Sequence, residues 1–117
     1  MAEQQLWKFK PLLPLAQAEV IIDGALKTAR SQSMEPLTVA VLDTGGHLIA
    51  LKREDGSGIM RGQIALGKGW GALGMGAPSR LLRDRLSNRL GFVAALTDAS
   101  DGRFVPVPGG VLVLDQE

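Results

Sequence analysis

The only histidine, His47, is the most chemically versatile side chain in this sequence. It ends the stretch "DTGGH" (residues 43–47), which lies between two apolar runs. With this single imidazole, a histidine-dependent triad or a multi-histidine metal site is expected only if partner chains contribute to it. A haem iron needs only one strong protein ligand. Two interpretations of His47 therefore remain: it is an axial ligand of a haem iron, or it is simply a turn residue.

Three charged residues and a glycine pair form a second candidate set. Arg53 and Asp55 follow the second apolar run, where they could bind a ligand or simply close a strand with an Asp-Gly turn. Lys68 lies in an apolar helical pattern, where its ammonium needs a carboxylate, a carbonyl or an anionic ligand. Gly109 and Gly110 could present consecutive N–H groups to a carboxylate or phosphate. If Lys68 lies close to these glycines, they would together form an anion site. If Lys68 instead forms an ion pair with an acid such as Asp55, its role would be to stabilise the fold.

The composition limits the classes of function. The 117 residues suffice for one domain with a core, and 45% apolar with 21% charged residues is typical of globular chains. The net charge of +1 includes no basic block, so no nucleic-acid partner is expected. The absence of cysteine excludes disulfides and thiolate metal sites. Neither a signal peptide nor an apolar run of about 20 residues is found, so we expect a cytoplasmic protein without a membrane partner.

The apolar pattern predicts the elements that must position these side chains. We expect a lead-in over residues 1–14 and then an amphipathic helix to about Ser33, because apolar residues recur at three- and four-residue intervals from Leu15. Two nearly continuous apolar runs, residues 37–42 and 48–51, predict a β-hairpin that is covered on both faces. The glycines between them would supply its tight turn.

The second half of the sequence predicts helices and one more strand. Residues 58–75 have helical apolar spacing, yet five glycines interrupt it: Gly62, Gly67, Gly69, Gly71 and Gly74. Because each interior glycine costs about 0.5–1 kcal/mol, we expect another backbone to pack closely against this helix. Ser79 is a candidate cap for an arginine-rich helical region whose basic face is solvated. A Pro-Gly-Gly turn and an apolar strand over residues 111–114 follow.

In this order, "VAVLDTGGHLIALKREDG", "IALGKGWGAL" and "VPVPGGVLVLD" resemble the GlcG/HbpS-like haem-binding family, which includes the C-terminal domain of PduO-type adenosyltransferases. The resemblance implies one domain over residues 15–117. Its fold would be α+β, with an antiparallel sheet of about five strands flanked by helices in a profilin-like architecture. Family members generally continue through a further strand and a terminal helix. We therefore expect that this chain is truncated at its C-terminus or that neighbouring subunits supply the missing cover.

The resemblance also implies a homo-oligomer, dimeric or larger, that is connected with haem. We expect a small protein that binds haem or another carboxylate-bearing molecule through Arg53, Asp55, Lys68, Gly109 and Gly110, with His47 as a candidate iron ligand. The alternative is an accessory protein or small enzyme that acts on an organic acid in a catabolic pathway, with Asp55 as acid or base. Of the two, the binding role is favoured, and the catalytic residues of the alternative are otherwise left open. Haem is the only cofactor implied. In the family, the helix that corresponds to residues 58–75 is usually alanine-rich at the position of Trp70. We expect this large side chain to change the shape of the pocket or the packing of subunits.

Overall fold

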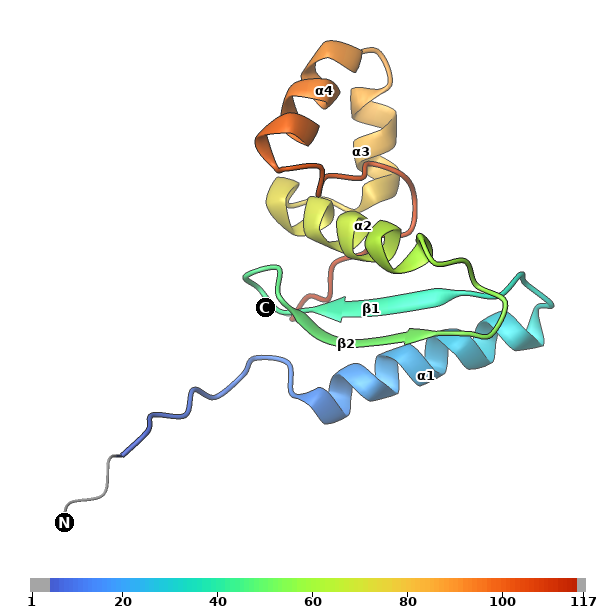
Figure 1. The fold of residues 1–117 in the computed structure, drawn as a ribbon, viewed down its shortest axis with the longest axis vertical. Coiled ribbons are helices and arrows are strands. Elements are labelled where there is room, and N and C mark those ends of the chain that lie inside the picture. The colour runs from blue at the N-terminus through green and yellow to red at the C-terminus, as the bar shows by residue number, and fades with distance from the viewer. Residues whose placement is uncertain (1–4, 116–117) are drawn as a thin grey trace.

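The computed structural model describes residues 5–115. Their elements follow the order α1 (Leu15–Ser31), β1 (Thr38–Leu42), β2 (Leu48–Arg53), α2 (Arg61–Met75), α3 (Ser79–Leu86) and α4 (Leu90–Ala99) (Figure 1). The predicted α+β class is confirmed. Within the described residues the sheet has two antiparallel strands, and the larger sheet of about five strands stays a prediction. No helix in this range is long and apolar enough to cross a membrane.

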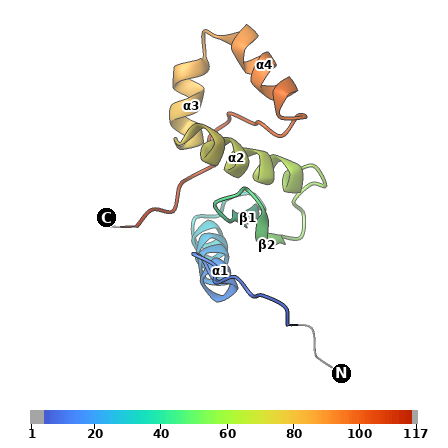
Figure 2. The ribbon, with the colours of Figure 1, turned by 90° about the vertical axis from the view of Figure 1, so that its left-hand side faces the viewer.

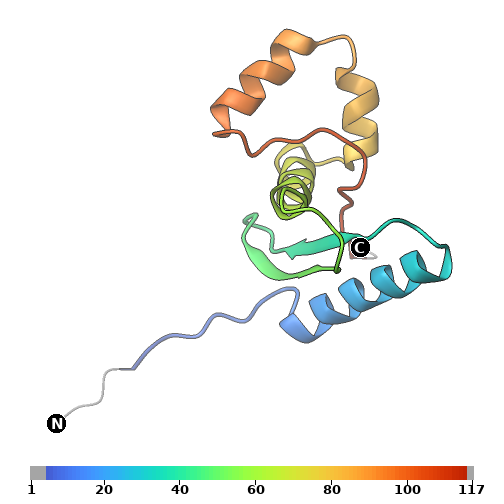
Figure 3. The ribbon, with the colours of Figure 1, turned by 45° about the vertical axis from the view of Figure 1, so that its right-hand side comes forward.

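The hairpin lies between two helices. β1 pairs with β2 in a register that sets Thr38 opposite Arg53 and Val41 opposite Ala50, with an irregularity after Val41. α1 covers one face of the hairpin and α2 covers the other (Figures 1 and 3). Ala18 and Ile22 of α1 are fully buried in a cluster with Val41. The prediction that both faces of these strands are covered is thus confirmed.

Two glycines of α2 allow the C-terminal segment to pack directly on the helix. A Cβ atom built on Gly67 would lie 2.7 Å from the carbonyl oxygen of Arg103, and one built on Gly71 would lie 3.0 Å from Cδ2 of Phe104. Gly69 faces the sheet instead, where a Cβ would lie 3.0 Å from Cδ1 of Leu42. The expected close approach of another backbone is confirmed, and residues 103–105 provide it.

α3 and α4 form a helical pair that stands away from α1 and the hairpin (Figures 1 and 2). Their inner sides share a small core with the end of α2 and the C-terminal segment: Ala77, Leu82, Leu86 and Phe104, with Val93 and Leu96 packed against it. The predicted cap is wrong, because Pro78 occupies the N-cap position of α3 and Ser79 is the first helical residue. Ser79 instead bonds to other segments of the chain.

Residues 111–114 do not form the expected strand. A strand is defined by a ladder of hydrogen bonds to a neighbour, and the only ladder within residues 5–115 is that between β1 and β2. Val111, Val113 and Leu114 remain exposed. An apolar run predicts a tendency to form a β-strand, but the strand forms only where a neighbouring strand is available for hydrogen bonding.

Candidate functional site

The turn that carries His47 is organised by Asp43. One carboxylate oxygen of Asp43 accepts hydrogen bonds from the backbone N–H groups of Gly45 and His47, both at 2.9 Å. The backbone bond from His47 is the largest cause that lowers the pKa of Asp43 below its ordinary value. Gly46 has a φ of +80°, which suits glycine. The sequence prediction of a glycine-dependent turn is confirmed.

The imidazole of His47 is open to solvent and already oriented. Its side chain is 80% exposed, and Nδ1 lies 3.1 Å from the same oxygen of Asp43. When Nδ1 carries the proton, it donates to Asp43 and Nε2 keeps its lone pair. Metal-ligating histidines commonly have such a carboxylate behind them. The pair therefore fits an iron ligand chemically, although no group of three or more His, Asp or Glu side chains suited to a metal ion occurs in residues 5–115.

Trp70 supports this turn from α2. A Cβ on Gly46 would lie 2.7 Å from Cδ1 of the indole, so the turn rests directly on the ring. The guanidinium carbon of Arg103 lies 4.6 Å from the ring centroid, which is a cation–π distance. The large side chain thus fills the space between the turn and the C-terminal segment. Sequence reasoning noted Trp70 without finding this role.

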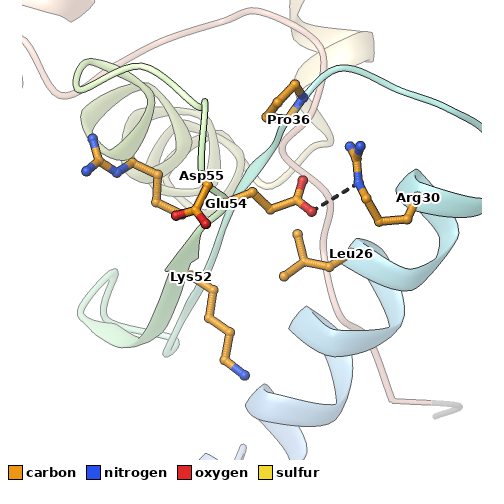
Figure 4. Close-up of a pocket in the computed structure, with 7 residues that line it drawn as sticks. Leu26, Arg30, Pro36, Lys52, Glu54 and Asp55 are labelled. Atoms are coloured by element: carbon orange, nitrogen blue, oxygen red, sulfur yellow. Dashed lines mark ion pairs between the residues drawn. The ribbon is translucent and has the colours of Figure 1, made fainter.

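A surface hollow of about 600 Å³, called the cavity below, lies between the C-terminal part of α1 and the end of β2 (Figure 4). It is widely open to solvent, unlike the sites that enclose most of a small ligand. Arg53 and Asp55, both predicted from the sequence as ligand-binding residues, line it. The other lining residues are Leu26, Arg30, Pro36, Lys52 and Glu54.

Most of the charges around this cavity are already neutralised. Nε of Arg30 lies 3.0 Å from Glu54, as the dashed line in Figure 4 marks. Lys52 bonds to Asp23 at 2.8 Å and to Glu19 at 3.1 Å, and the bond to Asp23 is the largest cause that raises the pKa of Lys52. The described part of the chain offers no ion-pair partner to Arg53 or Asp55.

Glu54 also lines the cavity, and its partners were not predicted from the sequence. Its second carboxylate oxygen accepts a 2.7 Å hydrogen bond from the backbone N–H of Leu37, and its side chain is only 18% exposed. Glu54 therefore joins the last turn of α1, the approach to β1 and the end of β2. The sequence places it beside Asp55, but nothing local indicates that its partners are Arg30 and Leu37.

Lys68 and the glycine pair converge, as the sequence suggested they could. A Cβ on Gly109 would lie 3.2 Å from Nζ of Lys68, so the ammonium lies beside this glycine. The N–H of Gly110 donates to the hydroxyl of Ser79 at 3.1 Å and is thereby occupied. The pair of free N–H groups that an anion nest requires is therefore reduced to that of Gly109. Within residues 5–115 Lys68 forms no ion pair, so the structural pairing with Asp55 does not occur.

The candidate residues occupy three separate places. The hairpin register sets Arg53 at the open end of the strands and His47 at the turn. Six residues of extended chain correspond to about 20 Å. Lys68, Gly109 and Gly110 line neither the cavity nor the turn. The cavity is the place where two predicted binding residues lie side by side without an internal partner in the described range.

The acid sensitivity of the turn provides a test of the Asp43 geometry. Because the folded pKa of Asp43 is lowered from 3.8, its stabilising effect is fully present above that pH and is lost as the pH falls through the lower folded value. We expect the amide shifts of Gly45 and His47, followed by NMR from about pH 6 to about pH 2, to titrate with a midpoint below 3.8. Asp43→Asn should abolish this transition. A midpoint at or above 3.8 would show that these bonds do not favour the carboxylate.

Comparison with known protein families identifies a matching family model. A family model described as "Haem degrading protein HbpS-like" matches residues 13–117, which is nearly the whole chain. The matched range includes the turn, the cavity and the contact between Lys68 and Gly109. No curated protein matches the chain.

Proposed function

Since the chain belongs to the HbpS-like haem-degrading protein family, we propose that it is a small homo-oligomeric protein that binds haem or another carboxylate-bearing molecule. The observation that carries the proposal is that Arg53 and Asp55 line the cavity and have no ion-pair partner among residues 5–115. A guanidinium can hold a carboxylate by two parallel hydrogen bonds. Asp55 beside it would accept a bond from a donor group of the same ligand.

Haem fits the residues at hand in two respects. Its propionates match the guanidinium of Arg53, and its iron matches the imidazole of His47 with Asp43 behind it. Haem would supply the redox-active iron. About 20 Å of strand separates the two residues, which is more than the distance from the iron to the propionates within one haem. Arg53 and His47 are therefore alternative contacts for haem, and each is tested by itself.

Titration with haemin tests the proposal. We expect a saturable shift of the Soret band with the wild-type protein and an affinity about tenfold or more lower for Arg53→Ala, because hydrogen bonds to charged groups contribute about 1.5–3 kcal/mol. Arg85→Ala, which removes an exposed arginine of α3 that does not line the cavity, is the matched control. A changed Soret spectrum in His47→Ala would identify the iron ligand.

The outcomes separate the parts of the proposal. No saturable shift in the wild type would remove haem as the ligand. An unchanged affinity in Arg53→Ala would show that the cavity is not the haem site. An unchanged Soret spectrum in His47→Ala would show only that His47 is not the iron ligand. Stabilisation by an organic acid that does not compete with haemin and is lost in Lys68→Met would favour the alternative function.

That alternative is an accessory protein or small enzyme that acts on an organic acid. The specific observation in its favour is the ammonium of Lys68 beside Gly109, where one carboxylate could contact both. Asp55 was expected to supply the acid or base, but it lines the cavity at β2, away from this contact. For the alternative function, Lys68 is placed to bind a carboxylate, but Asp55, the expected acid or base, does not lie beside it.

Three further predictions remain part of the proposal. The apolar residues 111–114 and the outer edge of β1 support a larger sheet. Exposed apolar side chains support a homo-oligomer. A cytoplasmic location rests on the N-terminal sequence pattern alone.

A further inference from the structure

The chain contains three Asp-Gly pairs, and the structure treats their peptide nitrogens differently. The pairs are Asp23-Gly24 in α1, Asp55-Gly56 between β2 and α2, and Asp101-Gly102 after α4. In such a pair the glycine nitrogen can attack the side-chain carboxyl group of the aspartate, because glycine is flexible and has no side chain to hinder the approach. A hydrogen bond from the glycine N–H opposes this attack, so the three sites differ in reactivity.

The Asp55-Gly56 pair forms the middle of a tight turn. The N–H of Ser57 donates to the carbonyl of Glu54 at 3.0 Å, and Gly56 has a φ of +89°. This φ is typical of a type II turn, whose hydrogen bond does not involve the N–H group of its central peptide. Within residues 5–115 the N–H of Gly56 donates to no backbone carbonyl, and Asp55 forms no ion pair. Both residues of the pair are exposed.

The other two pairs hold the glycine nitrogen in place. The N–H of Gly102 donates to the carbonyl of Thr97 at 2.8 Å. Gly24 lies in the middle of α1, where backbone N–H groups bond to carbonyls within the helix. Attack by either nitrogen first requires a local opening that breaks its hydrogen bond. Asp101 is exposed like Asp55, so the bonding of the glycine nitrogen, and not exposure, distinguishes these two sites.

We propose that Asp55 is a site of spontaneous covalent modification, at which the folded protein forms isoaspartate. The nitrogen of Gly56 bonds to the side-chain carboxyl carbon of Asp55. The hydroxyl of that carboxyl group leaves with the amide proton as water, and a cyclic succinimide results. Water then opens the ring at either carbonyl, which restores aspartate or gives isoaspartate. The mass of the chain is finally unchanged, and water is the only co-reactant.

The modification changes a residue that lines the cavity (Figure 4). In isoaspartate the main chain runs through the β-carbon, so the backbone gains a methylene group and the side chain loses one. The carboxylate beside Arg53 is therefore displaced. The product belongs to the substrate class of enzymes that methylate isoaspartyl carboxyl groups. The modification itself is independent of any ligand, whereas its effect on binding rests on the proposed function.

Ageing of the full chain at neutral pH tests the proposal, with the native protein and a sample unfolded in guanidinium chloride incubated side by side. Peptide mass spectrometry, together with methylation by a protein isoaspartyl methyltransferase, measures isoaspartate at each pair. The unfolded sample gives the rate that each pair has without structure. Relative to that rate, we expect native Asp55 to react at least about fivefold faster than Asp23 or Asp101, because no hydrogen bond has to be broken first.

Asp55→Glu is the control variant, since glutamate would have to close a larger and less favourable ring. It should remove the signal at this position and leave those at Asp23 and Asp101 unchanged. Protection of native Asp55 to the same degree as Asp101 would overturn the proposal. Isoaspartate that forms chiefly at Asp23 or Asp101 in the native protein would overturn it as well.

Haemin titration of fresh and aged protein examines the effect on binding separately. A lower affinity in proportion to the isoaspartate at position 55 would support a place for Asp55 in the binding site. An unchanged affinity would exclude Asp55 from haem binding and leave the modification standing. If fresh protein does not bind haemin, the proposed ligand is wrong, but the rates of isoaspartate formation still decide the present proposal.

Discussion

Replacement of Gly67 by alanine is expected to lower the free energy of unfolding by about 1–3 kcal/mol, although alanine is the better helix former. The added methyl group would overlap the Val105 side chain and lie 2.7 Å from the carbonyl oxygen of Arg103. A backbone oxygen cannot move aside as a flexible side chain can. The segment from Arg103 to Val105 would have to withdraw from α2, and its packing on the helix would be lost.

Gly74→Ala is the matched control, because it makes the same change in the same helix. The nearest atom to a Cβ on Gly74 is Cζ3 of Trp70 at 3.9 Å, which is an ordinary contact. This variant should therefore gain about 0.5–1 kcal/mol from helix propensity. Urea unfolding followed by circular dichroism measures both changes. If Gly67→Ala were as stable as Gly74→Ala, close packing would not be the reason for the glycine.

Ser79→Ala is expected to cost about 1–3 kcal/mol, because it leaves the backbone N–H of Gly110 without a partner in a buried place. The Ser79 hydroxyl donates to the carbonyl of Lys68 at 3.2 Å and accepts from the N–H of Gly110 at 3.1 Å. The backbone N–H of Ser79 also donates to the carbonyl of Gly110 at 2.8 Å. Ser79 itself is fully buried. One hydroxyl thus connects α2, α3 and the C-terminal segment.

The measurement for Ser79→Ala combines unfolding with amide hydrogen exchange. We expect exchange at Gly110 to accelerate more than exchange within β1, because the lost bond is local to the C-terminal segment. Ser87→Ala is the control, since its exposed hydroxyl donates only to the carbonyl of Asp84 at the end of the same helix. A change within about 0.5 kcal/mol is expected there. Equal losses in the two variants would contradict the connecting role of Ser79.

The elements that local pattern determines were predicted correctly. Apolar spacing placed α1 at Leu15, where the structure begins it, and residues 37–42 and 48–51 match β1 and β2 within two residues. Ser79 shows where local reasoning fails. A serine after proline looks like a helix cap, but its partners, Lys68 and Gly110, are set by the tertiary fold. The same reason explains residues 111–114, whose strand tendency depends on a neighbour.

The positions of the candidate site residues were predictable in part, and their function stays a prediction. Arg53 and Asp55 are close in sequence, so the end of one strand suffices to place both at the same cavity. The contact of Lys68 with Gly109 was considered because both are unusual residues in their local patterns. Glu54 could not be identified, because its role comes from Arg30, which is distant along the chain. The periodicity of apolar residues gives no information about an ion pair between residues so far apart in the sequence.

The packing of residues 103–105 on Gly67 and Gly71 has a consequence for the order in which the protein folds. Several glycines weaken α2 as an isolated helix, and its compensating contacts come from a segment that is synthesised only after α3 and α4. While the chain emerges from the ribosome, the hairpin and α1 can associate early, but α2 lacks one of its two packing partners. α2 is therefore not fully stable until residues 103–105, which are synthesised after α3 and α4, pack against it.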